Sequence, residues 1–288
     1  MDHPVIGLTA NITKPGAPAL TRQLAAQFRE GGAQVLCESM TAAAAGLPGG
    51  MPLLEVARQA AMMVVLGGDG TILHTARLLG AEVKPLAAVN VGRLGFLTTS
   101  TADETGAFVR ALLAGTVTVT RRRTVQACFI GHDGTSHCLT GLNEAVISRG
   151  AASRMVRLNI EINGAFVNCY RCDGLIVSTP TGSSAYNLSA GGPIISPEAQ
   201  VFCVAPICPH AVANRSLVVN DDAEIVLTPV ATAEELLLSM DGGPPVTLNR
   251  EAPVTISRGG WDVPLISLPG ASFFGVLRQK LQWNGSAA

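Results

Sequence analysis

The chain has 288 residues, enough for one large domain or two medium ones, each with a packed core. Hydrophobic residues make up 48 % of it and charged residues only 14 %, a composition typical of a globular protein and not of a disordered chain. The formal net charge of −1 argues against nucleic acid or an anionic membrane as the main partner, because both require a basic surface.

Three further features predict a cytoplasmic protein without a membrane segment. The apolar runs, such as Ala61–Leu66 and Leu236–Leu238, are far shorter than the roughly 20 residues of a membrane-spanning helix. The first residues, Met1 to Pro4, do not form the basic and then apolar pattern of a secretory signal. The seven scattered cysteines, an odd number, predict reduced thiols in a cytoplasmic protein.

Short apolar runs alternate with helix-like segments in the first part of the chain. The runs are Val5–Thr9, Gln34–Leu36, Met62–Leu66 and Leu86–Asn90, and the helix-like segments are Ala19–Glu30, Leu53–Ala60, Thr71–Leu79 and Asp103–Leu113. Glycines such as those at 31, 32 and 115 end the helical patterns. This alternation predicts βαβ units, and therefore a Rossmann-like α/β domain with a mostly parallel sheet over residues 1–117.

The pattern changes near Thr116 to short β-branched runs separated by turn signals. The runs are Val117–Thr120, Val125–Ile130, Ala145–Ser148, Leu158–Ile162, Gly174–Ser178, Ser216–Val219, Glu224–Leu227, Leu236–Met240 and Pro253–Ile256. Because helical periodicity is scarce, residues 118–267 are predicted to form an all-β, sandwich-like domain. The segment Phe273–Gln282 is amphipathic again, so residues 268–288 are expected to return to the first domain.

The sharpest local motif is Gly67-Gly68-Asp69-Gly70-Thr71, which lies between a predicted strand and a predicted helix. Open α/β sheets bind ligands at such turns, where glycines let the backbone approach an anion and the helix N-terminus points at it. A carboxylate in a phosphate-binding turn suits Mg²⁺ binding or acceptance of a proton from an attacking hydroxyl. The simpler interpretation is a glycine turn in which Asp69 caps the helix.

Two absences narrow the kind of nucleotide site. The only lysines are Lys14, Lys84 and Lys280, and none follows a glycine, which excludes a P-loop. No Gly-x-Gly-x-x-Gly motif follows the first strand, so a dinucleotide is not held by the usual Rossmann fingerprint.

A second candidate binding segment is the loop from Asp173 to Pro193, whose hydroxyl and glycine residues suit ribose hydroxyls and a pyrophosphate. The third is the pair Asn143-Glu144, an amide and a carboxylate side by side.

Taken in chain order, these motifs resemble the bacterial NAD kinases. The segments that carry the resemblance are Gly67–Gly70, Gly92-Arg93-Leu94-Gly95-Phe96, Asn143-Glu144, Asp173-Gly174, Thr181-Gly182-Ser183-Ser184-Ala185-Tyr186 and Pro206-Ile207-Cys208-Pro209-His210. The resemblance runs from Val5 to about Asp241. The glycine turn is shared with lipid kinases and phosphofructokinases, whereas the 173–193 loop is specific. Ser184 stands where the family usually has threonine, and Gly243 stands where glutamine is common, which removes one expected contact.

The resemblance implies an NAD kinase/diacylglycerol kinase-like fold and transfer of the γ-phosphoryl group of ATP to the adenosine 2′-hydroxyl of NAD. Asp69 would be the catalytic base, Gly70 and His74 would border the ligand, and Asn143 and Glu144 would hold the adenosine end. The other expected substrate-binding residues are Arg154, Arg171, Asp173, Thr181, Ser184, Ala185, Tyr186, Asn187, Leu188 and Ser189. A charged residue at position 171 implies preference for NAD over NADH. The simpler roles are a solvated histidine for His74, a surface ion pair for Arg154 and a core tyrosine for Tyr186.

The same resemblance implies Mg²⁺ carried by ATP, and a homodimer or homotetramer that pairs through the β domain and shares a site between chains. Zinc is disfavoured at Cys169-x-x-Cys172, because an odd spacing along a strand sends the two side chains to opposite faces. Two alternatives remain: a lipid or sugar kinase that uses the same glycine turn, and a non-catalytic dinucleotide sensor.

Overall fold

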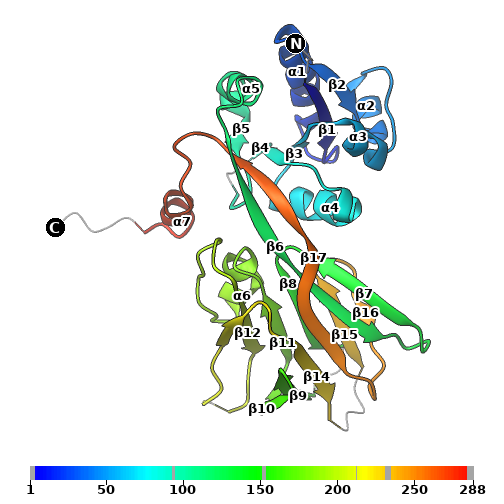
Figure 1. Cartoon of the computed structure of the whole chain (residues 1–288), viewed down its shortest axis with the longest axis vertical. Helices are drawn as coiled ribbons and strands as arrows, with labels where there is room; N and C mark the ends of the chain where they lie inside the picture. The colour runs from blue at the N-terminus through cyan, green and yellow to red at the C-terminus, as the bar shows by residue number, and fades with distance from the viewer. Residues whose placement is uncertain (1–3, 93–94, 151–153, 212, 231–234, 284–288) are drawn as a thin grey trace, which may run out of the picture. The chain divides into compact units, whose positions relative to one another are not determined.

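The computed structural model describes residues 4–92, 95–150, 154–211, 213–230 and 235–283 (Figure 1). They divide into two compact units, one made of Met1–Arg121 with Val263–Ala288 and the other of Arg122–Asp262. Strands β6 (Thr118–Ile130) and β17 (Val254–Ser267) each contribute residues to both units.

The first unit is built on a parallel sheet in the order β2-β1-β3-β4. Its strands are β1 (Val5–Ala10), β2 (Gln34–Cys37), β3 (Met62–Leu66) and β4 (Leu86–Asn90), with the short β5 (Ser100–Thr101) and the end of β17 beside β4. The register places Ala10 opposite Leu66 and Leu66 opposite Val89. The carboxyl ends of three neighbouring strands therefore meet at one edge, where ligands bind in open α/β sheets.

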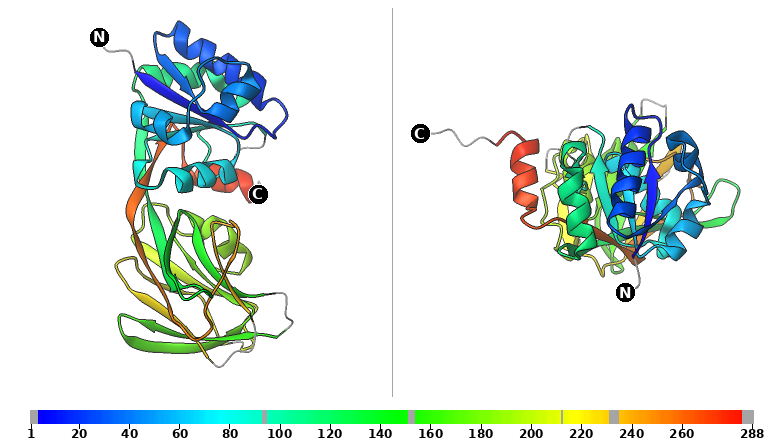
Figure 2. Two further views of the ribbon diagram at one scale, coloured as in Figure 1. Left: turned by 90° about the vertical axis from the view of Figure 1, so that its right-hand side faces the viewer. Right: turned by 90° about the horizontal axis from the view of Figure 1, so that it is seen from above.

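Helices cover the sheet of the first unit on both faces (Figure 2). They are α1 (Ala17–Glu30), α2 (Ser39–Ala45), α3 (Leu53–Gln59), α4 (Asp69–Leu79) and α5 (Thr105–Leu113), with single 3₁₀ turns at Gly80–Glu82 and Ala102–Glu104. Helix α7 (Phe273–Lys280) follows β17. On one face Phe28 of α1 packs edge-on against Phe108 of α5, with ring centroids 6.5 Å apart. No helix of the described residues is long and apolar enough to cross a membrane.

The second unit consists of two antiparallel layers with one apolar core between them. The first layer contains β9 (Val156–Ile162), β10 (Ala165–Cys172), β14 (Ile225–Pro229), β17, β6 and β7 (Ser136–Gly141). The second contains β8 (Glu144–Arg149), β11 (Gly174–Ser178), β12 (Val201–Ile207), β13 (Leu217–Asn220), β15 (Leu236–Met240) and β16 (Val246–Thr247). A 3₁₀ turn at Gly182–Ser184 and helix α6 (Tyr186–Ser189) follow β11. Strand β11 is buried along its whole length, which explains its continuous apolar sequence.

The predicted fold class, α/β followed by all-β, is confirmed. The predicted strands at 62–66, 86–90, 174–178 and 236–240 coincide with β3, β4, β11 and β15. The runs Val117–Thr120 and Val125–Ile130 are one strand, β6, because the polar residues between them continue the extended backbone along its partner strands. Helix α2 was not predicted, since it is only seven residues long and its start depends on a cap by Glu38.

The prediction of seven reduced thiols is wrong for Cys128 and Cys138, which form a disulfide. They lie directly opposite each other on β6 and β7, a register that the sequence does not reveal. The prediction that Cys169 and Cys172 face opposite ways is confirmed, since the first is exposed and the second buried. Burial raises the pKa of the Cys172 thiol to about 12, so this side chain behaves as a small apolar residue.

Candidate active site

The glycine turn connects β3 to α4 at the carboxyl edge of the parallel sheet. Gly67 is required by close packing, because a Cβ there would lie 2.2 Å from the Thr71 Oγ1 atom. Gly68 is the residue that precedes the helix, and it offers no side-chain cap to the first N–H groups of α4. The turn therefore presents backbone donors and the positive end of a helix dipole to an anion.

The Asp69 carboxylate is held in place by the loop after Gly95. The Phe96 N–H donates to Oδ2 at 2.9 Å, and the Leu97 N–H donates to Oδ1 at 3.0 Å. Gly95 is needed for this approach, since a Cβ there would lie 1.9 Å from Oδ1. Asp69 thus binds a neighbouring loop and does not cap its own helix, which corrects the simpler interpretation of this residue. Arg93 and Leu94 of the same motif lie outside the described residues.

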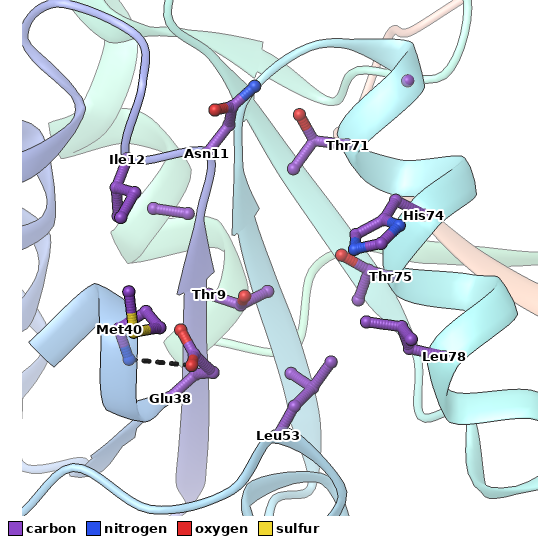
Figure 3. Close-up of a pocket in the computed structure, with 12 residues that line it drawn as sticks. Thr9, Asn11, Ile12, Glu38, Met40, Leu53, Thr71, His74, Thr75 and Leu78 are labelled. Carbon is purple, nitrogen blue, oxygen red and sulfur yellow. Dashed lines mark hydrogen bonds between the residues drawn. The ribbon is translucent and has the colours of Figure 1, made fainter. Parts of the chain in front are cut away.

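A pocket of about 420 Å³ adjoins this turn (Figure 3). It lies among the end of β1, the start of α2 and one side of α4, and two of the predicted residues, Gly70 and His74, line it. The His74 ring is exposed, and its Nδ1 atom is 3.3 Å from an Nη atom of Arg77. Sequence reasoning missed Asn11 and Glu38 as lining residues. The signal was available, because both come directly after a strand of the parallel sheet.

Asn143 and Glu144 form a buried polar site at the start of β8 in the second unit. Asp241 holds the backbone of this segment, accepting the N–H groups of Leu142, Asn143 and Glu144 at 2.7, 2.7 and 3.1 Å. The Asn143 Oδ1 and Glu144 Oε2 atoms are buried without a hydrogen-bond partner. Burial, together with the nearby Asp241 charge, raises the pKa of Glu144 to about 8. Sequence reasoning named Asp241 only as the end of the family resemblance and missed this role.

The loop after β11 packs directly against Asn143. The Thr179 N–H donates to the Asn143 carbonyl at 2.8 Å, and a Cβ at Gly182 would lie 2.2 Å from the same oxygen. Within the loop, the Asn187 side chain donates to the Ser183 and Pro193 carbonyls, while its Oδ1 atom is buried and unpaired.

The predicted residues of this loop therefore share one region with Asn143 and Glu144: Thr181, Ser184, Ala185, Tyr186, Asn187, Leu188 and Ser189. The Tyr186 side chain is 45 % exposed, so it is not a core tyrosine.

Asp173 lies at the opposite end of β11 from this region. Gly174 pairs with Ser148, whereas Ser178 pairs with Glu144, so the five-residue strand separates Asp173 from the buried acceptors by about 17 Å. The Asp173 carboxylate accepts a hydrogen bond from Arg149 Nε at 2.9 Å. Arg171 and Arg154 are exposed. Within the second unit, these three predicted residues do not converge on Asn143.

An anion site that also contains a fixed carboxylate suits transfer of a phosphoryl group, in which a hydroxyl attacks phosphorus and loses a proton. Buried acceptors without partners suit a ligand rich in hydroxyl and amino donors. Together with the α/β and all-β architecture, these features define a small-molecule kinase.

Comparison with known proteins identifies which kinase family this is. Residues 53–117 match the ATP-NAD kinase N-terminal domain, and residues 142–268 match the ATP-NAD kinase C-terminal domain. An NAD kinase of Moorella thermoacetica is 37 % identical over 98 % of this chain and 90 % of its own. An NAD kinase of Solibacter usitatus is 36 % identical over 98 % of this chain and 99 % of its own. A yeast NADH kinase complexed with NADH, 22 % identical, has the same fold with a TM-score of 0.90, covering 100 % of this chain and 90 % of its own.

The chain belongs to the NAD kinase family, and its activity is that of an NAD kinase. A solved NAD kinase from Archaeoglobus fulgidus in complex with ATP matches 98 % of this chain and all of its own at a TM-score of 0.76 and 22 % identity. Neither a lipid kinase nor a sugar kinase is among these relatives, so that alternative has no support.

Proposed function

We propose that Asp69 accepts the proton of the adenosine 2′-hydroxyl of NAD while the γ-phosphoryl group of ATP is transferred to that oxygen. The observation that carries this role is the fixed carboxylate beside the backbone donors of the glycine turn. Each Asp69 oxygen accepts one backbone N–H, which leaves lone pairs for a hydroxyl. Because phosphoryl transfer has a loose transition state, the base is needed only late, and its main task is to orient the hydroxyl.

In this proposal, the second unit binds NAD, the substrate that accepts the phosphoryl group. Asn143 Oδ1 and Glu144 Oε2 are buried acceptors, which match the hydroxyl and amino donors of adenosine. The loop that contains Thr181 and residues 184–189 borders the nicotinamide riboside half, with the exposed Tyr186 ring available for stacking. In the first unit, Gly70 and His74 border the transferred phosphoryl group.

Magnesium enters this scheme as part of the substrate, bound to the phosphates of ATP. Among the described residues, no three histidine, cysteine or acidic side chains come together as a metal cage. Mg²⁺ commonly keeps substrate oxygens and waters as ligands, so a donor set without a cage fits an ion that arrives with the triphosphate.

A site shared between two copies of the chain would use the residues that lie apart within one copy. Arg171, near the end of β10, is exposed, and Asp173, directly before β11, is half-exposed, so a partner can reach both. We therefore propose a homodimer or homotetramer in which these two residues complete the partner's site. Mixing the inactive variants Asp69→Asn and Asp173→Asn should restore part of the activity, up to about a quarter if the subunits exchange at random. A monomer by light scattering, with no restoration, would rule out sharing.

The direct test is NADP formation by the purified chain with Mg²⁺, ATP and NAD, detected with a dehydrogenase that accepts only the 2′-phosphorylated product. We expect NAD to be preferred over NADH, because Arg171 places a charge beside the dinucleotide. We also expect the protein in the cytoplasm, where both substrates are abundant. Labelled phosphate on diacylglycerol or fructose 6-phosphate, and none on NAD, would overturn the proposal. Calorimetric binding of NAD without any NADP would instead favour a dinucleotide sensor.

A further inference from the structure

The disulfide between Cys128 and Cys138 joins two neighbouring strands of the second unit, and phosphoryl transfer does not require it. Cys128 lies on β6 and Cys138 on β7, directly opposite each other in the middle of the β6–β7 pairing. Disulfides of cytoplasmic proteins, the class expected for this chain, are usually transient and take part in catalysis or in redox sensing. This cysteine pair is therefore a candidate site of reversible modification.

The disulfide is accessible from solvent. Cys138 is exposed, Cys128 is half-buried, and residues 132–137 of the connecting hairpin are exposed as well. By contrast, three of the five free cysteines of the described residues are buried. Thiol–disulfide exchange begins when a thiolate reaches one of the two sulfurs, so exposed disulfides are the ones that reductants open. Cys138 is thus the point of attack, and Cys128 is the leaving group.

Strand β7 is held weakly apart from this bond. Within the described residues it pairs only with β6, so it is an edge strand. Its first half is exposed, with the His137 ring stacked on Phe129 at 5.5 Å between centroids, and Leu139 is its one side chain packed against the apolar core. Segments with few buried contacts open locally more easily than the core does. The disulfide therefore limits the opening of β7 away from β6.

Strand β7 leads directly into the buried polar site of the second unit. It ends at Gly141, and β8 begins at Glu144. A Cβ on Gly141 would lie 2.7 Å from the Asp241 Oδ1 atom, which also accepts the Asn143 N–H at 2.7 Å. One carboxylate therefore contacts both the end of β7 and the segment that is proposed to bind NAD, a few residues after Cys138. Opening of β7 would disturb that segment through this shared contact.

We infer that the Cys128–Cys138 disulfide is a redox modification site that a dithiol reductant opens, and that its opening weakens the binding of NAD by the second unit. The second part rests on the proposed role of Asn143 and Glu144. A thiolate of the reductant attacks the Cys138 sulfur and forms a mixed disulfide, while Cys128 leaves as a thiolate and takes up a proton. The second thiol of the reductant then displaces Cys138, which is protonated in turn. The dithiol thereby loses an electron pair and becomes a disulfide, and the cysteine pair is reduced to two thiols.

The chemical step is tested by alkylating the thiols of the full-length enzyme under native conditions and locating the labels by mass spectrometry. Without reductant, iodoacetamide should modify Cys169 and Cys208, the exposed free cysteines. After millimolar dithiothreitol, Cys128 and Cys138 should be modified as well, and reoxidation with diamide should protect them again. A disulfide that opens only in denaturant would overturn the proposal, and so would a cysteine pair that stays reduced in diamide.

NADP formation by the oxidised and the reduced enzyme tests the effect on NAD binding. Reduction should raise the KM for NAD by about fivefold or more, the lower end of typical coupling between two sites, and leave the KM for ATP within about twofold. Cys138→Ser cannot form the disulfide, so it should show the raised KM for NAD with or without dithiothreitol. Cys169→Ser is the matched control, because it removes an exposed thiol of the same unit and should keep the wild-type response.

A KM for NAD that is equal in the two forms of the wild type, or lower after reduction, would overturn the proposal. This comparison needs no variant, so it holds even if Cys138→Ser does not fold. Failure of both forms to make NADP would refute the proposed function instead. Calorimetric binding of NAD to the oxidised and the reduced chain would then decide the inference by itself, so the two failures are distinguishable.

Discussion

The two units present their polar groups to a ligand in opposite ways. In the first unit the glycine turn and Lys14 offer hydrogen-bond donors and positive charge at an accessible edge of the sheet. In the second unit Asn143, Glu144 and Asn187 each keep a buried side-chain oxygen without a partner. The donors match phosphate oxygens, and the acceptors match hydroxyl and amino groups.

This difference indicates which part of a substrate each unit binds. A phosphate chain carries only acceptors, so the unpaired oxygens of the second unit would repel it. An adenosine moiety carries donors that satisfy those oxygens, and an unsatisfied buried acceptor costs about 1–3 kcal/mol. The second unit therefore selects an adenosine moiety over a phosphate chain, through groups that are left unpaired until the ligand binds.

The largest effect is expected from Asp69→Asn. Loss of the base should lower kcat by about 10³-fold, since general-base catalysis contributes roughly 10²–10⁴. The amide also turns an NH₂ group toward the Phe96 or the Leu97 N–H, which should lower the free energy of unfolding by about 1–2 kcal/mol. Measuring kcat together with the urea midpoint separates the two effects.

Asp103→Asn is the matched control, because this exposed carboxyl lies in the same unit away from the glycine turn. It should leave kcat and the midpoint unchanged. An Asp69→Asn enzyme that retained the wild-type kcat would show that the carboxylate only holds the loop after Gly95.

Gly182→Ala should disturb the binding of NAD by the second unit. The added Cβ would meet the Asn143 carbonyl at 2.2 Å, and backbone atoms must shift to make room. We expect the KM for NAD to rise by about tenfold, and the free energy of unfolding to fall by about 1–3 kcal/mol, as in other overpacked sites. Gly260→Ala, where a Cβ meets nothing within 4 Å, should change neither quantity. A selective rise in the KM for ATP would contradict the division of roles between the units.

The sequence indicated groups on both sides of the comparison, but not the residues that hold them in place, for a physical reason. A glycine turn between a strand and a helix is a local pattern, so Asp69 and Gly70 could be found from spacing alone. Asp241 lies about a hundred residues from the segment it holds, and only the pairing of β15 with β8 brings them together. The Cys128–Cys138 disulfide was missed for the same reason, since it depends on the register of β6 and β7.

Glu38 and Lys14 were missed although both are local to the first unit. Glu38 follows a strand that was predicted, but its significance depends on β2 lying beside β1. Lys14 was considered only as a P-loop lysine, which must follow the glycines in sequence. In the structure a lysine from the loop after β1 reaches the glycine turn after β3, because these two strands are neighbours in the sheet.

The smallest effect on activity is expected from the protonation of Glu144. Its pKa rises from 4.5 to about 8 on folding, chiefly because the carboxyl is buried. Between these values the folded state holds a proton that the unfolded chain has lost, so the free energy of unfolding should fall as pH rises, by up to about 1.4 kcal/mol per pH unit. The stabilisation is fully present below pH 4.5 and is lost by about pH 8. Urea unfolding of Glu144→Gln between pH 5 and 8 should show a flatter profile.

Glutamine also imitates the protonated carboxyl, since it both donates and accepts at nearly the same size. NAD affinity of the wild type should therefore change above pH 8, where Glu144 ionises beside Asp241, whereas that of Glu144→Gln should not. Glu224→Gln, which alters an exposed carboxyl of the same unit, should follow the wild-type profile in both measurements. Parallel profiles for wild type and Glu144→Gln would mean that the buried carboxyl is already ionised at neutral pH. Adenosine would then meet the negative charge of Glu144 in the second unit. The second unit would no longer be a neutral site that contrasts with the charged site of the first unit.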